Sequence, residues 1–180
     1  MTGTGPLTEY RSVAELRASG RRLEGYAARF GVEARIADFI ETIAAGAFKE
    51  TLSSKKDVLA LVDHDRSKVL ARTRSKTLKL SEDSQGLSFD LSLPDTQSGR
   101  DVLALAERND LGGMSFGFTV NGKDGERWAG NRRELRSVNL VEISIVSAWP
   151  AYPETTVVAR SKTPRLNLAR LYLETLRWEY

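Results

Sequence analysis

The chain has 180 residues, 41% of them hydrophobic, which suits one ordinary domain with a hydrophobic core and excludes a disordered protein. Its 27 basic and 24 acidic residues leave a formal charge of only +3, so the composition does not indicate a polycationic face for nucleic acid. The chain contains no cysteine and one histidine. Disulfides, thiolate ligands and a cysteine nucleophile are therefore excluded, and no metal site is expected.

The sequence gives no sign of a membrane segment or of export. No stretch approaches the roughly 18 consecutive apolar residues that a membrane-spanning helix needs. The first nine residues lack the basic and apolar regions of a signal peptide. We therefore expect a soluble protein that stays in a reducing cytoplasm and has no membrane partner.

The first 20 residues differ in character from those that follow. They are rich in threonine, serine, glycine and charge and show no sustained period, which indicates a flexible N-terminal arm or a weak first helix. An ordered domain is expected to begin at Arg21, and its first strand is predicted over residues 23–30.

The next segments predict a short helix and a strand that ends at the histidine. Within residues 46–52, Phe48 and Leu52 are spaced to share one face of a helix. The β-branched and leucine-rich run 58–62 predicts a buried strand. His64 follows it directly, at a position where a side chain is held rigidly and can still reach a cleft.

The middle of the chain alternates strands with one helix. Residues 87–93 have apolar side chains at every odd position and polar ones at every even position, which is typical of a half-buried strand. A capping-box pattern from Ser98 to Asp101 predicts the start of a helix that Gly112 and Gly113 would end. Two further strands are expected at residues 69–73 and 77–80.

Two later strands place polar side chains opposite apolar faces, because successive side chains of a strand point to opposite sides. In the strand 115–120, Ser115 lies opposite the apolar face, so we expect it to point away from the aromatic core, beside Gly117, which has no side chain to block access. In the strand 138–146, Glu142 and Ser144 share one face. The expected apolar faces are Phe116, Phe118 and Val120 in the first strand, and Val141, Ile143 and Ile145 in the second.

The remaining segments predict a hairpin, a last strand and a terminal helix. The basic stretch from Arg127 to Arg136 is interpreted as a solvated hairpin, with a phosphate-contacting arm as the alternative. Prolines near residue 150 mark the approach to the end of the domain, and a short strand is expected at 155–159. Residues 165–180 predict an amphipathic helix that follows a linker.

His64 is the only histidine of the chain, so it is the only imidazole base that Ser115 could be paired with. Serine is a weak nucleophile until a base removes its proton, and imidazole is suited to that role near neutral pH. A third group must orient the imidazole and stabilise its charged form. Glu142 from a different strand is the favoured candidate, and a structural ion pair of Glu142 with an arginine is the alternative. Asp63 and Asp65 are less favoured, because the neighbours of a residue in a strand point to the opposite face. They are kept as fallbacks.

Other residues near Ser115 have less defined roles. An acyl-transfer site needs backbone N–H donors for the developing oxyanion. The three glycines close to Ser115 would allow the backbone to approach, although a helix stop and a strand bend account for them equally well. Ser144 is interpreted as a packing or hydrogen-bonding residue. The glycines concerned are Gly112, Gly113 and Gly117.

Six sequence blocks, in order from residue 23 to 152, resemble the prohead maturation proteases of tailed bacteriophages of the HK97 type, which also occur in prophages and gene-transfer agents. The combination of Met-Ser-Phe-Gly-Phe with Glu-Ile-Ser-Ile-Val is the specific part of the resemblance. The blocks are Leu23 to Gly31, Gly46 to Phe48, Leu61 to Asp65, Leu70 to Thr73, Gly112 to Phe118, and Leu140 to Val146 with Pro150 to Tyr152.

The resemblance implies an α+β fold, predominantly a β-barrel surrounded by helices, similar to the herpesvirus assemblin. It implies a serine endopeptidase with His64 as the base and Ser115 as the nucleophile, and Glu142 occupies the matching third position. The expected domains are a flexible arm over 1–20, a prohead protease domain over 21–160, and a linker with the amphipathic helix over 161–180.

The same resemblance implies how the enzyme would act in the cell. It would enter the immature procapsid in the host bacterial cytoplasm, cleave the scaffolding part of the major capsid protein and then digest itself, without a cofactor. By analogy with the assemblin dimer, the C-terminal helix would mediate a homodimer; packing onto its own barrel or docking to the scaffold is the alternative.

Two other functions are kept as alternatives. A non-enzymatic β-barrel assembly factor would bind the major capsid protein and would not need Ser115. A DNA-binding packaging protein would use Arg127 to Arg136, with binding that falls steeply with salt. The modest net charge argues against the second alternative.

Overall fold

The computed structural model describes residues 9–13 and 16–147, and this part of the chain is mostly β-sheet. The strands are β1 (Glu9–Val13), β2 (Leu16–Ser19), β3 (Arg22–Arg29), β4 (Ala34–Ile36), β5 (Phe39–Ile43), β6 (Leu59–Val62), β7 (Asp65–Arg72), β8 (Leu78–Glu82), β9 (Gly86–Ser92), β10 (Gly113–Val120), β11 (Glu126–Ala129), β12 (Arg132–Leu135) and β13 (Val138–Val146). The helices are α1 (Lys49–Ser53) and α2 (Gln97–Glu107).

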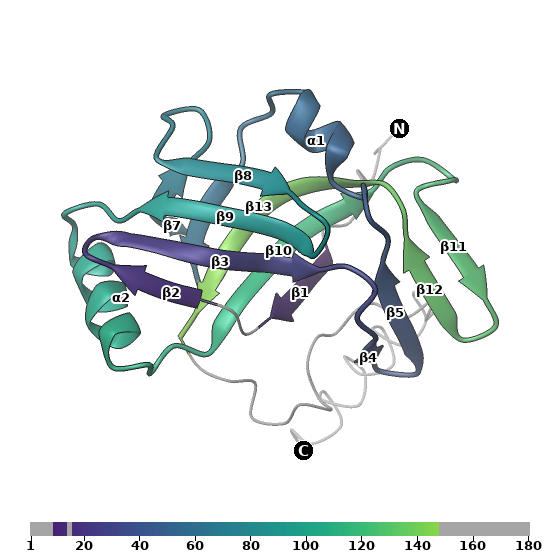
Figure 1. The fold of residues 1–180 in the computed structure, drawn as a ribbon, viewed down its shortest axis with the longest axis horizontal. Helices are drawn as coiled ribbons and strands as arrows, with labels where there is room; N and C mark the ends of the chain where they lie inside the picture. Colours follow the sequence, from purple (N-terminus) through teal and green to yellow (C-terminus); the bar gives the residue numbers. More distant parts are fainter. Residues whose placement is uncertain (1–8, 14–15, 148–180) are drawn as a thin grey trace, which may run out of the picture.

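The described strands form three open sheets, with orders β1-β10-β13-β6-β7, β11-β12-β5-β4 and β2-β3-β9-β8. The sheet of β3, β9 and β8 lies across the sheet that contains β10 and β13, while α2 and the β11-β12 hairpin occupy opposite ends of the molecule (Figure 1). The expectation of a predominantly β fold is confirmed, whereas the expected surround of helices is not. A closed barrel is not confirmed either: the described sheets have free edges, and only two helices accompany them.

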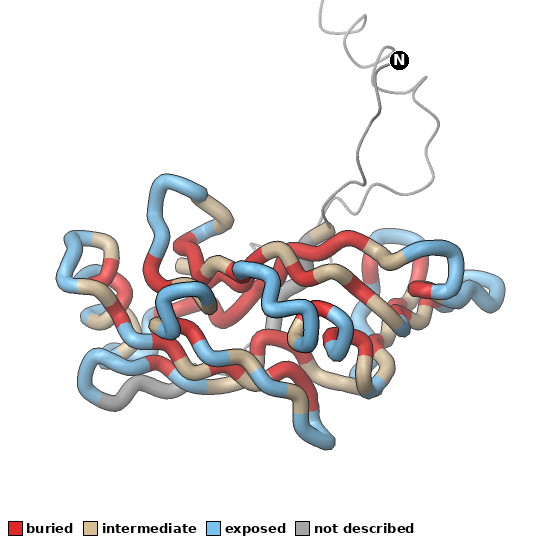
Figure 2. Tube along the Cα trace, turned by 90° about the horizontal axis from the view of Figure 1, so that it is seen from above, coloured by how far each residue is buried: buried red, intermediate tan, exposed pale blue. Residues whose placement is uncertain are grey.

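A large hydrophobic core lies between the sheets, and a separate small cluster is formed by Ile36 and Phe39. The ring of Phe48 contacts that of Phe116 edge to face at a centroid distance of 5.6 Å, and Phe116 stacks on Phe118 at 5.3 Å. All three side chains are fully buried, and burial of such a side chain contributes about 1.5–3 kcal/mol. Buried positions run along the middle of the layers, whereas exposed positions gather at the turns (Figure 2).

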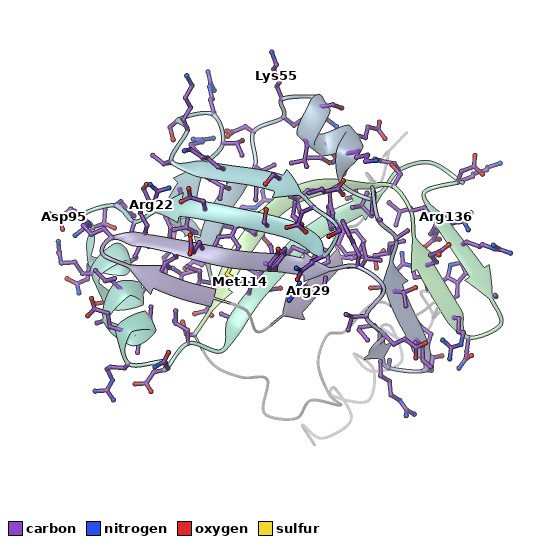
Figure 3. The ribbon with its side chains drawn as sticks, in the orientation of Figure 1. Arg22, Arg29, Lys55, Asp95, Met114 and Arg136 are labelled. Atoms are coloured by element: carbon purple, nitrogen blue, oxygen red, sulfur yellow. The ribbon has the colours of Figure 1, made fainter. Side chains whose placement is uncertain are left out.

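The alternating segment around β9 was predicted correctly. Leu87, Phe89, Leu91 and Leu93 are all buried, and the polar residues between them are not. This alternation turns one face of β9 toward the core. In Figure 3 Lys55, Asp95 and Arg136 lie at the periphery of the molecule, whereas Met114 of β10 lies near its middle.

The N-terminal segment contains strands where we expected a flexible arm or a weak helix. β1 pairs with β10 and β2 pairs with β3, both antiparallel. β1 runs beside β10 with Ser12 opposite Ser115. Ordered structure therefore starts well before Arg21.

The start and the end of α2 also differ from the prediction. The N-cap is Thr96, whose hydroxyl accepts a hydrogen bond from Gly99 N–H at 3.3 Å, and Ser98 lies inside the helix. Gly112 and Gly113 do not end the helix; α2 stops at Glu107, and Asn109 follows with a φ of 58°. Asparagine tolerates this left-handed conformation, so a glycine is not needed there.

A β-bulge changes the expected face of β13. Gly117 pairs with Glu142 and Phe118 pairs with Leu140, so Val141 is the extra residue. Val141 is only half-buried, and Leu140 takes its place in the core. The prediction of Val141 as a core residue was wrong, whereas those of Ile143 and Ile145 were correct.

The basic hairpin is confirmed as β11 and β12, which pair antiparallel. It is not solvated throughout, because Arg133 is buried against three carboxylates. Neither described helix is long and apolar enough to cross a membrane. The strand expected at 155–159, the helix at 165–180 and the domain boundary at 160 lie outside the described residues.

Candidate active site

His64 lies in a two-residue turn between β6 and β7. Val62 pairs with Asp65, so that Asp63 and His64 are the two residues of the turn. Their φ angles are 48° and 60°. Two positive φ angles are the signature of a type I′ hairpin turn, and non-glycine residues adopt them only at a cost in free energy. The position of His64 at the end of a strand was predicted correctly.

Contacts to the end of β13 hold this turn in place. The Asp63 N–H donates to the carbonyl of Ile145 at 2.9 Å. The Asp63 carboxylate accepts hydrogen bonds from the N–H of Ser147 at 2.8 Å and from its hydroxyl at 2.7 Å. Asp63 therefore stabilises the backbone that carries His64, and its carboxylate is engaged away from the ring.

The imidazole of His64 is hydrogen-bonded to Glu142. Nδ1 of His64 and Oε1 of Glu142 are 2.7 Å apart, and the two side chains are 28% and 5% exposed. The carboxylate of Asp65 accepts hydrogen bonds from the hydroxyl and the N–H of Ser67. These hydrogen bonds hold the pKa of Asp65 below its ordinary value. Of the three carboxylates that the sequence offered, the structure brings Glu142 to His64.

Glu142 has a second partner on its own strand. The hydroxyl of Ser144 donates to Oε2 of Glu142 at 2.5 Å, and the same hydroxyl accepts a hydrogen bond from the His64 N–H at 3.2 Å. The sequence placed Glu142 and Ser144 on one face of a strand but did not predict that Ser144 contacts His64. The sequence signal for this contact is that Glu142 and Ser144 are two positions apart, which places both side chains on one face of the strand.

Ser115 lies on the adjacent strand β10, on the same side as Glu142 and Ser144. Ser115 is paired with Ser144, and Gly117 with Glu142, and directly paired residues of antiparallel strands share a face. Ser115 points away from Phe116, as expected, but it is 1% exposed and not open to solvent. Its Oγ has no hydrogen-bond partner among the described residues. An unpaired buried hydroxyl is costly, which makes this atom unusual in a folded protein.

The backbone around the glycines near Ser115 is described in part by its hydrogen bonds and dihedral angles. The N–H of Gly112 donates to the carbonyl of Val146 at 2.8 Å, so this donor belongs to the sheet. Gly113 has a φ of 133°, which other residues rarely adopt. Among the described residues, no group of three histidine or acidic side chains is arranged to hold a metal ion.

Comparisons with known proteins identify the family of the chain and a structure with a similar fold. The family model of the caudovirus prohead serine proteases matches residues 8–167. Among solved structures, the chain is similar in fold to gp21, the capsid assembly protease of bacteriophage T4. The TM-score is 0.52 at 9% sequence identity, over 80% of this chain and 96% of that chain. No curated protein matches the sequence.

The family match covers most of the chain and distinguishes between the functions considered above. It favours an enzyme over the non-enzymatic assembly factor and over the DNA-binding protein. The chain belongs to the caudovirus prohead serine protease family and is a serine protease, a hydrolase of peptide bonds.

Proposed function

We propose that the chain is a capsid-maturation endopeptidase in which Ser115 is the nucleophile, His64 the general base and Glu142 the group that orients His64. The 2.7 Å hydrogen bond between His64 and Glu142 is the observation that carries this proposal. A buried carboxylate on Nδ1 fixes the tautomer in which Nε2 is the proton acceptor.

The proposed reaction follows the order known for serine hydrolases. The Oγ of Ser115 attacks the peptide carbonyl while Nε2 of His64 takes the hydroxyl proton. The imidazolium then gives that proton to the leaving amine, which leaves an acyl-enzyme on Ser115. Water, deprotonated by the same imidazole, attacks the ester; the imidazolium then returns this proton to Oγ of Ser115 as the new carboxyl terminus is released. The negative charge of Glu142 stabilises the imidazolium in both halves.

The buried, unpaired hydroxyl of Ser115 fits a nucleophile whose site is completed by substrate. Catalytic hydrogen bonds are often long or absent without substrate and form in the complex. In the proposed enzyme, substrate binding brings the hydroxyl of Ser115 to His64 and opens access to it.

The proposed substrate is the scaffolding part of the major capsid protein, cleaved inside the procapsid in the host cytoplasm and followed by self-digestion. The family name and the T4 capsid assembly protease support a substrate of this kind. The assemblin-like barrel and a homodimer through residues 165–180 remain predictions.

Co-expression with the cognate major capsid protein tests the proposal. Wild type, Ser115→Ala and the control Ser81→Ala are each expressed with it, and intact masses of both chains are measured. Ser81 lies on the exposed part of β8, where its hydroxyl contacts that of Ser88. Truncation of the capsid protein is expected with wild type and Ser81→Ala and is expected to vanish with Ser115→Ala. Unchanged masses in all three, with the protease packaged in assembled procapsids, would refute the proposal.

A further inference from the structure

We propose that Ser144 is a positioning residue, which holds the Glu142 carboxylate and the backbone of the His64 turn in one fixed relation to Ser115. The proposal rests on the function proposed above. It adds a residue that does not touch the reacting atoms and acts through Glu142 and His64.

The hydroxyl of Ser144 has defined partners in a fully buried site. Ser144 is 0% exposed, and its hydroxyl donates its single proton to Oε2 of Glu142. A hydroxyl has one proton and two lone pairs, so it can accept from the His64 N–H at the same time. The donation to the carboxylate is charge-assisted, which makes it the stronger of the two interactions and fixes the direction of the hydroxyl.

Three hydrogen bonds thereby form a closed ring. Ser144 holds the backbone of His64, Glu142 holds the imidazole of His64, and Ser144 holds Glu142. The ring fixes the imidazole relative to its own backbone. His64 has a left-handed backbone conformation, which is unfavourable for a residue other than glycine. The hydrogen bonds of the ring stabilise this conformation.

Ser144 also lies where the three strands of the site meet. It is paired with Ser115 of β10 on one side and with Leu61 of β6 on the other. The turn with His64 begins two residues after Leu61. Ser144 therefore connects the strand that carries the nucleophile to the turn that carries the base.

Thr51 supplies a matched comparison. It is 3% exposed, its hydroxyl donates to the carbonyl of Val138 at 3.0 Å, and it accepts from the N–H of Leu140 at 2.9 Å. Like Ser144 it makes two hydrogen bonds through its hydroxyl, but both are to the backbone at the other end of β13. Loss of either hydroxyl should affect folding stability to a similar extent, while only loss of Ser144 should affect His64.

The test compares Ser144→Ala, Ser144→Cys and Thr51→Val by two measurements. The first is kcat and KM on a peptide that contains a mapped cleavage site. The second is the Nδ1–H proton resonance of His64, which needs no assignment because the chain has one histidine. It is recorded in the Ser115→Ala background, so that it does not depend on proteolysis.

Ser144→Ala is expected to lower kcat by roughly 10- to 100-fold with little change in KM, since misplacement of a catalytic group by about 1 Å has effects of this size. The Nδ1–H resonance should broaden through faster exchange with water. Ser144→Cys is slightly larger than serine, leaves no cavity and weakens the donor, so it covers the case in which the cavity left by alanine prevents folding. Thr51→Val should have the kcat and KM of wild type and should leave the Nδ1–H resonance of His64 unchanged.

A wild-type kcat and an unchanged Nδ1–H resonance in folded Ser144→Ala or Ser144→Cys would overturn the positioning role. Equal effects of Thr51→Val on both readouts would also overturn it, because they would show a general loss of structure. If wild type cleaves no substrate, the resonance still decides the role of Ser144, and only the proposed function fails.

Discussion

Ser115 and Ser144 lie directly opposite each other on the adjacent antiparallel strands β10 and β13. The buried hydroxyl of Ser144 has two hydrogen-bond partners, whereas that of Ser115 has none among the described residues. The sheet therefore places a fully bonded serine and an unpaired serine side by side. This difference suits a support role for Ser144 and a reactive role for Ser115.

Glu142→Gln tests the orienting role of the buried carboxylate. The amide can still accept the hydrogen bond from Nδ1 in one orientation, but it carries no charge to stabilise the imidazolium. We expect kcat/KM to fall by roughly 10⁴-fold, in line with the loss on neutralising the acid of a serine protease triad. Steady-state kinetics on a cleavage-site peptide measures this loss.

Glu41→Gln is the matched control for this substitution. Glu41 is equally buried, at 2% exposure, and its carboxylate accepts a hydrogen bond from Arg133 at 2.9 Å. This control should be less stable than wild type and should cleave normally once folded. If Glu41→Gln lost as much activity as Glu142→Gln, the effect of the latter would have to be assigned to stability.

Local sequence patterns predicted those parts of the fold that depend on strand alternation. The alternating segment 87–93 formed a strand with one face in the core, and His64 was placed correctly at the end of a strand. Glu142 and Ser144 were placed on one face, which is the face that meets His64. Period-two patterning determines these features, and it can be read without tertiary information.

The remaining features depend on contacts between distant segments. The bulge at Val141 moves Leu140 into the core, and regular alternation cannot indicate an extra residue. Arg133 resembles its neighbours in sequence, and its burial follows from Glu9 and Glu41, which are remote in the chain. Likewise β1 is ordered by its pairing with β10, and its own composition is that of an arm.

Asp63→Ala should damage the turn that carries His64. Alanine at a φ of 48° costs about 1–2 kcal/mol, and both hydrogen bonds to Ser147 are lost. We expect a loss of roughly 2–3 kcal/mol in the free energy of unfolding and a lower kcat/KM in the folded variant. Urea unfolding in the Ser115→Ala background gives the first quantity, and peptide cleavage gives the second.

Asp63→Asn separates these contributions. Asparagine tolerates the left-handed conformation, and its carbonyl can still accept from the N–H of Ser147. This variant should remain close to wild type in both measurements. Equal damage by alanine and asparagine would show that the negative charge of Asp63, and not the shape of the turn, is what matters.

Tyr26→Phe should raise the pKa of Asp83. The hydroxyl of Tyr26 donates to the Asp83 carboxylate at 2.6 Å, and this bond, followed by the N–H of Gln85, holds the pKa of Asp83 below its ordinary value. The pKa of Asp83 is lowered in the folded state. Asp83 therefore stabilises the fold at pH values above the ordinary pKa of aspartate, and this stabilisation is lost as the pH falls through the pKa of Asp83 in the folded protein. Phenylalanine keeps the ring beneath Arg29, so only the hydroxyl is removed.

The ¹³C carboxyl titration of the folded protein measures this shift. The midpoint of Asp83 should move up toward its ordinary value, and acid unfolding should begin at a higher pH. Asp57 is an internal control, because Arg72 lowers its pKa and no contact to Tyr26 is involved. A midpoint of Asp83 that does not move would mean that the backbone donors alone account for its lowered pKa.

Arg133→Met should destabilise the fold strongly, since Arg133 holds the carboxylates of Glu9, Glu41 and Glu126 together. Burial acts to lower the pKa of the guanidinium, but these carboxylates raise it above its ordinary value. Because the pKa of Arg133 is raised in the folded state, its contribution to stability is fully present at pH values below the ordinary pKa of arginine. Arg133 is therefore charged throughout the neutral pH range. Removal of one partner from a buried ionic cluster costs about 3–5 kcal/mol, which urea unfolding in the Ser115→Ala background should show.

The adjacent Arg132→Met is the matched control for this cluster. Arg132 pairs with Glu33, and both side chains are more than half exposed. An exposed pair contributes about 0–1 kcal/mol and is screened by salt, whereas a buried cluster is screened much less. The loss in Arg133→Met should therefore persist in high salt, and the small loss in Arg132→Met should disappear. Equal losses in the two variants would show that the buried cluster around Arg133 contributes no more to stability than an exposed ion pair.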